Sequence, residues 1–255
     1  MRSGFVRRLA GYVFAVAFVG GGWQLAALAV GNPVLPGPLE ALPMVARYFD
    51  ELWPAFLTSL YRVVAAMAIG TVLAVPLGLA CGRSPRADAL FAPVLYVLYP
   101  LPKVVLLPVL VVLMGLADAP KIALIAITIF FQVLVTVRDA ARGVPEESVT
   151  SMRSLGATRL DVYRHAIVPA TLPDLFTALR ISSGTAVAIL FFAESLAGST
   201  GLGYFIVDAW ALLAYPKMFA GIIAMAVLGV VLYELFDIAE RRLTRWRMAA
   251  HAGGR

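Results

Sequence analysis

The sequence predicts an all-α integral membrane protein with six transmembrane helices. Three observations predict it: 61% of the residues are hydrophobic, only 14% are charged, and the mean hydropathy is +0.88. Soluble domains are about 45–50% apolar and about 25% charged, and a core of this size cannot bury the difference. The apolar excess therefore requires a bilayer and excludes disordered and collagen-like chains. Cys81 is the single cysteine, which excludes an internal disulfide framework.

The first predicted span is Leu9–Val30, which carries no formal charge. At 1.5 Å per residue it extends about 33 Å, enough to cross a hydrocarbon core of about 30 Å. Arg2, Arg7 and Arg8 precede it, as in a secretory signal peptide. The apolar run is longer than the hydrophobic region of such a peptide, and no clean A-x-A site follows. We therefore expect a retained helix.

A proline-rich segment, residues 31–62, follows and is predicted to be an external loop. We expect it to hold a short interfacial helix, with Trp53 as an aromatic anchor. Five further spans are predicted after it: Val63–Cys81, Leu90–Gly115, Ile122–Val137, Leu175–Leu196 and Met218–Phe236. Several contain prolines, which membrane helices tolerate where neighbouring helices satisfy the freed backbone groups.

The basic residues predict the orientation. With six spans, all of the 21 Lys and Arg residues would be cytoplasmic except Arg47, Arg62, Lys103, Lys121 and Lys217. Cytoplasmic loops carry the excess of Lys and Arg, so this distribution predicts that both termini are cytoplasmic.

The largest cytoplasmic segment, residues 138–172, contains the signals of two short helices. Glu146 and Glu147 follow Pro145, where carboxylates favour the start of a helix. An apolar stripe comes next, and Gly156 is placed to end the helix in a left-handed conformation. Thr158 and Asp161 then have the spacing of a capping box. The stripes of the two helices are Val149, Met152 and Leu155, then Leu160, Tyr163 and Ile167.

Two interpretations of this helix–Gly–helix segment stay open on composition alone. A basic amphipathic connector commonly lies against anionic lipid. The same geometry also suits a docking element for a cytoplasmic partner.

The segment SVTSMRSLGATRLDVYRHAIVPATLP, Ser148 to Pro173, resembles the "EAA" cytoplasmic loop of ABC-transporter permeases of the binding-protein-dependent importer type. The EAA positions fall on Thr150, Ser151 and Met152, the glycine on Gly156 and the proline on Pro169. The acid and both alanines of the family pattern are absent. Two further stretches, Pro100–Gly115 and Ala193–Ala209, are similar to permeases of the nitrate/taurine/sulfonate branch.

The resemblance implies a type I importer (MetI-like) permease fold in a bacterial inner membrane. Residues 1–56 would form an N-terminal helix and external loop, 57–245 a five-helix core containing the loop 138–172, and 246–255 a cytoplasmic tail. It implies a coupling helix seated on a separate ATPase, and makes docking the preferred interpretation of the loop. The implied ATPase-coupling residues are Glu146, Glu147, Thr150, Ser151, Met152, Arg153, Leu155, Gly156 and Ala157.

The same resemblance implies the partners: two copies of the ATPase, a second copy of this chain, and a periplasmic or lipid-anchored substrate-binding protein. The sequence contains no G-x-x-x-x-G-K-[ST] phosphate loop, so ATP would be bound by the partner and no cofactor by this chain. No catalytic constellation, metal site or nucleic-acid-binding pattern is expected. The main alternative is a secondary transporter or channel, which would favour inverted repeats and several buried acids.

Polar residues inside the spans are candidates for the translocation path, because such groups usually face a cavity or one another. The candidates are Lys103, Gln132, Ser183 and Glu194, with Glu194 near the outer mouth. A lysine in the path would favour an anionic cargo such as a sulfonate or nitrate. Second interpretations stay open: Lys103 bonded to carbonyls freed by Pro100 and Pro102, Gln132 in an interhelical hydrogen bond, and Glu194 reaching the external interface.

Overall fold

The computed structural model describes residues 2–244, with side chains described from Ala10 onward, so the predicted tail 246–255 lies outside it. The described part is helical throughout, without a strand. Its elements are α1 (Arg2–Val30), α2 (Pro38–Arg47), α3 (Phe49–Arg83), α4 (Pro85–Leu98), the 3₁₀ turn η1 (Lys103–Leu106), α5 (Leu107–Met114), α6 (Asp118–Arg142), α7 (Glu146–Ser154), α8 (Arg159–Val162), the π-helical turn η2 (Tyr163–Ile167), α9 (Val168–Ala197), α10 (Leu202–Ala211) and α11 (Tyr215–Leu243).

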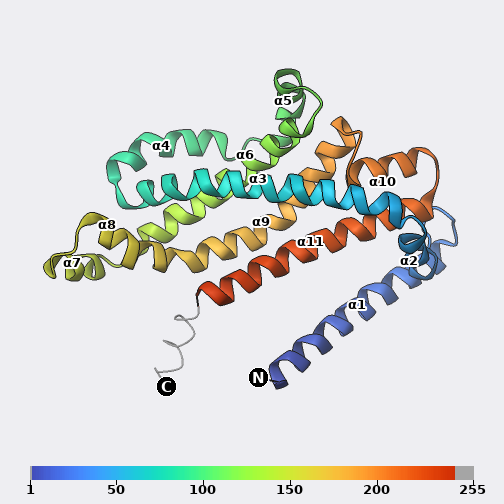
Figure 1. Ribbon diagram of the computed structural model, residues 1–255, viewed down its shortest axis with the longest axis horizontal. Helices are drawn as coiled ribbons and strands as arrows, with labels where there is room; N and C mark the ends of the chain where they lie inside the picture. Colours follow the sequence, from blue (N-terminus) through green and yellow to red (C-terminus); the bar gives the residue numbers. More distant parts are fainter. Residues whose placement is uncertain (1, 245–255) are drawn as a thin grey trace.

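Four long helices form the centre of the molecule (Figure 1). α3 packs on α6, α6 on α9, and α9 on α11. The short helices α7 and α8 lie at one end of the long axis, and α2 and α10 lie at the other. The prediction of an all-α membrane bundle is confirmed, and different short helices lie at its two ends.

The predicted span Leu90–Gly115 is not one straight helix. Within the described residues, five helices are long and apolar enough to cross a membrane, and a sixth span exists only if α4 and η1–α5 count together. These two pieces are bent by 85° at the break between them. Pro100 and Pro102 lie in that break, and proline removes the backbone donors that a continuous helix needs.

The external loop expected at residues 31–62 is much shorter than predicted. α3 begins at Phe49, so Val63 lies inside a 35-residue helix. Asp50 and Glu51 occupy its first turn, where the helix dipole favours carboxylates. The expected short helix is α2, but Trp53 belongs to α3, where its ring lies 5.8 Å from that of Phe49 and 6.0 Å from that of Phe56.

Two glycines let α3 approach α6 closely. A Cβ atom at Gly78 would lie 3.0 Å from the carbonyl oxygen of Leu134, and one at Gly82 would lie 2.5 Å from that of Arg138. Lipid tails are as apolar as leucine, so helices in a bilayer associate through close packing rather than through hydrophobic exclusion from water. The G-x-x-x-G spacing of Gly78 and Gly82 therefore holds these two central helices together.

α1 lies against the outside of the bundle (Figure 1). Its Trp23 ring stacks on Phe219 of α11 at 5.4 Å, and its indole N–H donates to the carbonyl of Pro36 at 2.9 Å. Most side chains of α1 are exposed, so α1 is an addition to the bundle rather than part of its core.

Candidate functional site

The loop 138–172 forms the helix–Gly–helix that its sequence predicts. α7 begins with Glu146 and Glu147 in its first turn. Gly156, at φ +85°, ends it in the left-handed region. The amide of Gly156 donates to the carbonyl of Arg153 and that of Ala157 to the carbonyl of Met152, at 3.0 and 3.1 Å, which is the Schellman pattern. The turn after α7 therefore has a defined geometry.

The second helix begins at the predicted capping box. The Thr158 backbone N–H donates to Asp161 Oδ2 at 2.9 Å, and the Asp161 N–H donates to Thr158 Oγ1 at 3.3 Å. α8 then continues through η2 into α9, which begins at Val168 rather than at Leu175. Pro169 lies in the first turn of α9, where its missing N–H costs no helical bond.

The two short helices bury one face and expose another. Val149 and Val162 are 1% and 3% exposed and pack into the core. Leu155 and Leu160 are 88% and 75% exposed, although both are large and apolar. Of the other predicted coupling residues, Met152 and Ala157 are half-buried against the core, and those exposed are Glu146, Glu147, Thr150, Ser151, Arg153 and Gly156.

Ion pairs connect this loop and its surroundings to the membrane helices. Arg83, the last residue of α3, donates from Nη2 to Glu146 Oε2 at 2.6 Å. Asp88 in the first turn of α4 accepts from Arg138 Nε and Arg142 Nη2 of α6, each at 2.5 Å. Charge pairs thus join the end of α3 to the start of α7, and the end of α6 to the start of α4.

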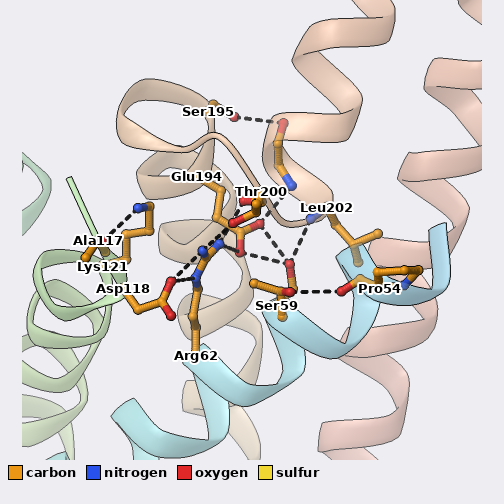
Figure 2. A network of polar contacts seen from close by, with 12 residues as sticks. Pro54, Ser59, Arg62, Ala117, Asp118, Lys121, Glu194, Ser195, Thr200 and Leu202 are labelled. Carbon is orange, nitrogen blue, oxygen red and sulfur yellow. Dashed lines mark hydrogen bonds and ion pairs between the residues drawn. The ribbon is translucent and has the colours of Figure 1, made fainter. Parts of the chain in front are cut away.

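A second polar cluster is buried at the opposite end of the bundle, around Arg62 (Figure 2). The Arg62 side chain is 2% exposed and uses all five of its N–H donors. Nε and Nη2 donate to Asp118 Oδ1 at 2.8 and 2.6 Å. Nη1 donates to Glu194 Oε1 at 2.7 Å and to the Thr200 carbonyl at 2.8 Å, and Nη2 to Thr200 Oγ1 at 2.7 Å. One guanidinium therefore joins α3, α6, α9 and the turn before α10.

The Glu194 carboxylate is the second centre of this cluster and is 0% exposed. Besides Arg62, it accepts from Ser59 Oγ at 2.9 and 2.8 Å and from the Gly203 N–H at 2.8 Å. Ser59 Oγ in turn accepts from the Leu202 N–H at 2.8 Å. A buried charge is tolerated only when it is paired and hydrogen-bonded, and both conditions hold here.

The glycine-rich turn at residues 198–203 is shaped around that carboxylate. Gly201 has φ +101°, and a Cβ atom there would collide with the Glu194 carboxylate. A Cβ atom at Gly203 would lie 2.7 Å from Glu194 Cβ. The backbone can therefore close over the charge only because these positions have no side chain.

The predicted path residues do not gather at one place. Glu194 neither faces an open path within the chain nor reaches the external interface, because its carboxylate is enclosed by the cluster. Ser183 is 1% exposed and donates to the Arg180 carbonyl of its own helix at 2.7 Å. Ser183 nevertheless lines a cavity of about 440 Å³ between α9 and α11, beside Gly184 and Tyr233. That Ser183 and Glu194 line the translocation path stays a prediction.

Lys103 lies at the break between α4 and α5, and Gln132 lies on α6, which packs against η1. The Lys103 ammonium donates to the Tyr99 carbonyl and lies 5.1 Å from the ring centroid of Phe131, the residue next to Gln132. Gln132 Oε1 is buried and has no hydrogen-bond partner among the described residues, so no interhelical bond to this atom is present. The Gln132 oxygen is therefore, among the described residues, a buried acceptor without a partner on a helix that packs against η1.

Sequence reasoning did not single out Ser59, Arg62, Asp118 or Thr200 as site residues. Arg62 was expected at the end of the external loop 31–62, because hydropathy does not show that α3 begins at Phe49. A signal was present in the turn 198–203: three glycines beside an acid in a span indicate a backbone that closes around that acid.

Comparison with known families decides the class of the chain. Residues 74–245 match the family described as "Binding-protein-dependent transport system inner membrane component". The chain belongs to this family of permeases. The permease is 32% identical to the taurine transport system permease protein TauC of Escherichia coli K12 over 232 residues, which is 88% of this chain and 84% of that protein. It is also 32% identical to the putative aliphatic sulfonates transport permease SsuC of Bacillus subtilis, over 86% of this chain and 80% of that protein.

Solved structures confirm the type I importer fold. A chain of the inward-facing methionine ABC transporter MetNI matches the permease with a TM-score of 0.62 and 19% identity, covering 79% of this chain and 98% of that one. An amino acid ABC transporter matches with a TM-score of 0.57. The permease is thus a multi-pass membrane subunit of an ABC importer, and the family description implies an ATPase and a binding protein as partners.

Proposed function

We propose that the permease pairs with a second copy of itself to form the translocation path of an importer for a small sulfonate-like anion. Two copies of a separate ATPase bind ATP and drive it, and an external binding protein delivers the cargo. The observation that carries this proposal is the exposed apolar surface of Leu155 and Leu160 on a loop with fixed geometry.

The exposed surface of Leu155 and Leu160, which we call the docking surface, supports the assignment of α7 as the coupling helix. Two large leucines on a cytoplasmic surface are costly in water, and covering each of them contributes about 1.5–3 kcal/mol. The ion pair between Arg83 and Glu146 transmits a displacement of α7 to α3. An ATPase that moves this loop therefore also moves a membrane helix.

The anionic cargo is supported by Lys103 together with Gln132. The Lys103 ammonium at the broken span can bind an oxyanion, and the unpaired Gln132 oxygen on α6 can accept from a donor of the same cargo. Relatives named for taurine and aliphatic sulfonates agree with this chemistry. Another relative is named for formylaminopyrimidine, so membership of the family does not by itself favour an anionic cargo. The support for an anionic cargo comes from Lys103. Ser183 and Glu194 have partners within the chain, and we assign them no direct contact with cargo.

The orientation follows from the charge distribution. The coupling loop and the charge pairs around Asp88 lie at one end of the bundle, which we assign to the cytoplasm together with both termini. The Arg62–Glu194 cluster then lies toward the external side, and the membrane is the inner one that the family description names.

Reconstitution tests the proposal. Proteoliposomes that hold the permease, its ATPase and its binding protein should accumulate labelled taurine only with ATP, and an ATPase without its phosphate-loop lysine is the control. Accumulation by the permease alone under an ion gradient would instead establish the secondary-transporter alternative.

A further inference from the structure

A cavity of about 920 Å³ lies between the coupling loop and the cytoplasmic ends of the membrane helices. Its lining comes from the turn between α3 and α4, from the end of α6, and from α7, α8 and η2. Cavities that bind small ligands span about 300–1,000 Å³, so this one has room for a ligand. It is separate from the Arg62 cluster and from the break at Lys103.

The charges of the cavity are strongly unequal. Two carboxylates line it, Asp88 and Glu146, and they are paired with Arg142 and Arg83. Three further arginines line it without an ion pair or hydrogen bond among the described side chains: Arg86, Arg153 and Arg159. Three guanidinium groups around one space repel one another until an anion enters it.

The helix that begins at the cavity adds to this field. Ser84 Oγ caps α4 by accepting from the Ala87 N–H at 3.3 Å, and Pro85 is its first residue. The N-terminus of a 14-residue helix is the positive end of its dipole. The helix end and the three arginines are all positive, so both favour an anionic ligand.

Arg153 and Arg159 do not share the surface of the exposed leucines. Arg153 lies one helical turn after Val149, and Arg159 three residues before Val162, so each shares a face with a buried valine that also lines the cavity. Leu155 and Leu160 are outside the lining. The two arginines thus line the cavity beside the buried valines while remaining exposed to solvent, and the two leucines do not line it.

We propose that this cavity binds a phosphate group, held by Arg86, Arg153 and Arg159. The guanidinium fork matches phosphate oxygens in a bidentate manner. Two sources share this chemistry: the headgroup of an acidic phospholipid and a soluble phosphate. The cavity borders the start of α4, a helix whose Leu90 and Val97 are 69% and 68% exposed and could pack against an acyl chain. A bound phosphate would connect α4 with α7 and α8, and so stiffen the coupling loop whatever cargo is carried.

The test uses the full chain purified in a nonionic detergent and measures its melting temperature. Circular dichroism of the helices follows unfolding, because Cys81 itself lines the cavity and a thiol-reactive dye would also respond to a ligand bound there. Inorganic phosphate is titrated in one arm, and nanodiscs of phosphatidylglycerol are compared with nanodiscs of phosphatidylcholine in the other. Arg86→Gln and Arg153→Gln are the test variants, and Arg164→Gln, an exposed arginine outside the cavity, is the control.

We expect phosphate or phosphatidylglycerol to raise the melting temperature. Each test variant should weaken the affinity for the ligand, measured from this rise, about tenfold, or about 1.4 kcal/mol, and Arg164→Gln should leave it unchanged. A response to phosphatidylglycerol alone identifies the lipid as the source, and a response to both ligands identifies soluble phosphate as sufficient. The melting temperature without ligand shows that each variant is folded, and Arg86→Lys should keep part of the response.

Three results would overturn the proposal: no response in either arm, a response unchanged in the test variants, or an equal loss in Arg164→Gln. If the test variants reduce recovery of the ATPase but leave the phosphate response intact, the arginines serve the partner protein instead.

Discussion

The Arg62 Nη1 atom lies 2.7 Å from Glu194 Oε1, although 132 residues separate the two positions along the chain. The pair is almost completely enclosed, with side chains 2% and 0% exposed. It joins α3 to α9 near the end of the bundle opposite α7 and α8, and Asp118 adds α6 to the same guanidinium. That end is thus held by one buried cation with two acidic partners.

Arg62→Met should destabilise the permease by about 3–5 kcal/mol, because it leaves Glu194 buried without its counter-charge. The melting temperature and the yield of folded chain measure this effect. Arg47→Met is the matched control, since Arg47 is exposed on α2. Equal stability of the two variants would show that the buried pair contributes nothing.

Gly201→Ala should cost more than about 1–3 kcal/mol, because it adds backbone strain at φ +101° and a collision with the Glu194 carboxylate. Gly115→Ala separates the two effects: its φ is +80°, but no atom lies within 4 Å of its added Cβ, so it should show only the strain. Thermal unfolding of both variants measures the difference. A larger loss for Gly115→Ala would contradict the enclosed carboxylate.

Leu155→Ser should reduce co-purification of the ATPase by about tenfold or more without lowering the melting temperature. The reason is that Leu155 is 88% exposed in the chain, so its apolar surface contributes to docking and not to folding. Leu196→Ser, at a 72% exposed position at the C-terminal end of α9, is the control and should leave co-purification of the ATPase intact. A parallel loss in the control would indicate a general effect of exposed leucines.

Lys103→Met should lower ATP-dependent uptake of taurine by about tenfold to a hundredfold while the complex with the ATPase still assembles. A hydrogen bond to a charged group contributes about 1.5–3 kcal/mol, which corresponds to that range. Transport assays in proteoliposomes measure it. Lys103→Arg keeps the positive charge and should retain more uptake, and full uptake by Lys103→Met would remove the lysine from the path.

The local features of the coupling loop could be predicted because their causes are local. Gly156 and the pair Thr158–Asp161 lie within a few residues of the backbone groups that they satisfy. Hydropathy likewise located the apolar helices, since bilayer thickness sets their minimum length.

The long-range features could not be predicted in the same way. Whether Glu194 faces a cavity or an arginine depends on which helices pack together, and the partner Arg62 lies in a helix whose start hydropathy did not detect. Pro100 and Pro102 predicted an opened backbone beside Lys103 but not an 85° bend, because prolines in a membrane helix are compatible with both a tolerated kink and a complete break.

That bend has a mechanical consequence. The start of α4 is attached to α6 by Asp88, and α5 begins after the break, at nearly a right angle to α4, where it also packs on α6. A displacement along the axis of α4 therefore has almost no component along α5. Lys103 begins the second piece, so a push on α4 along its axis would turn the backbone beside Lys103 rather than slide α5 along its own axis.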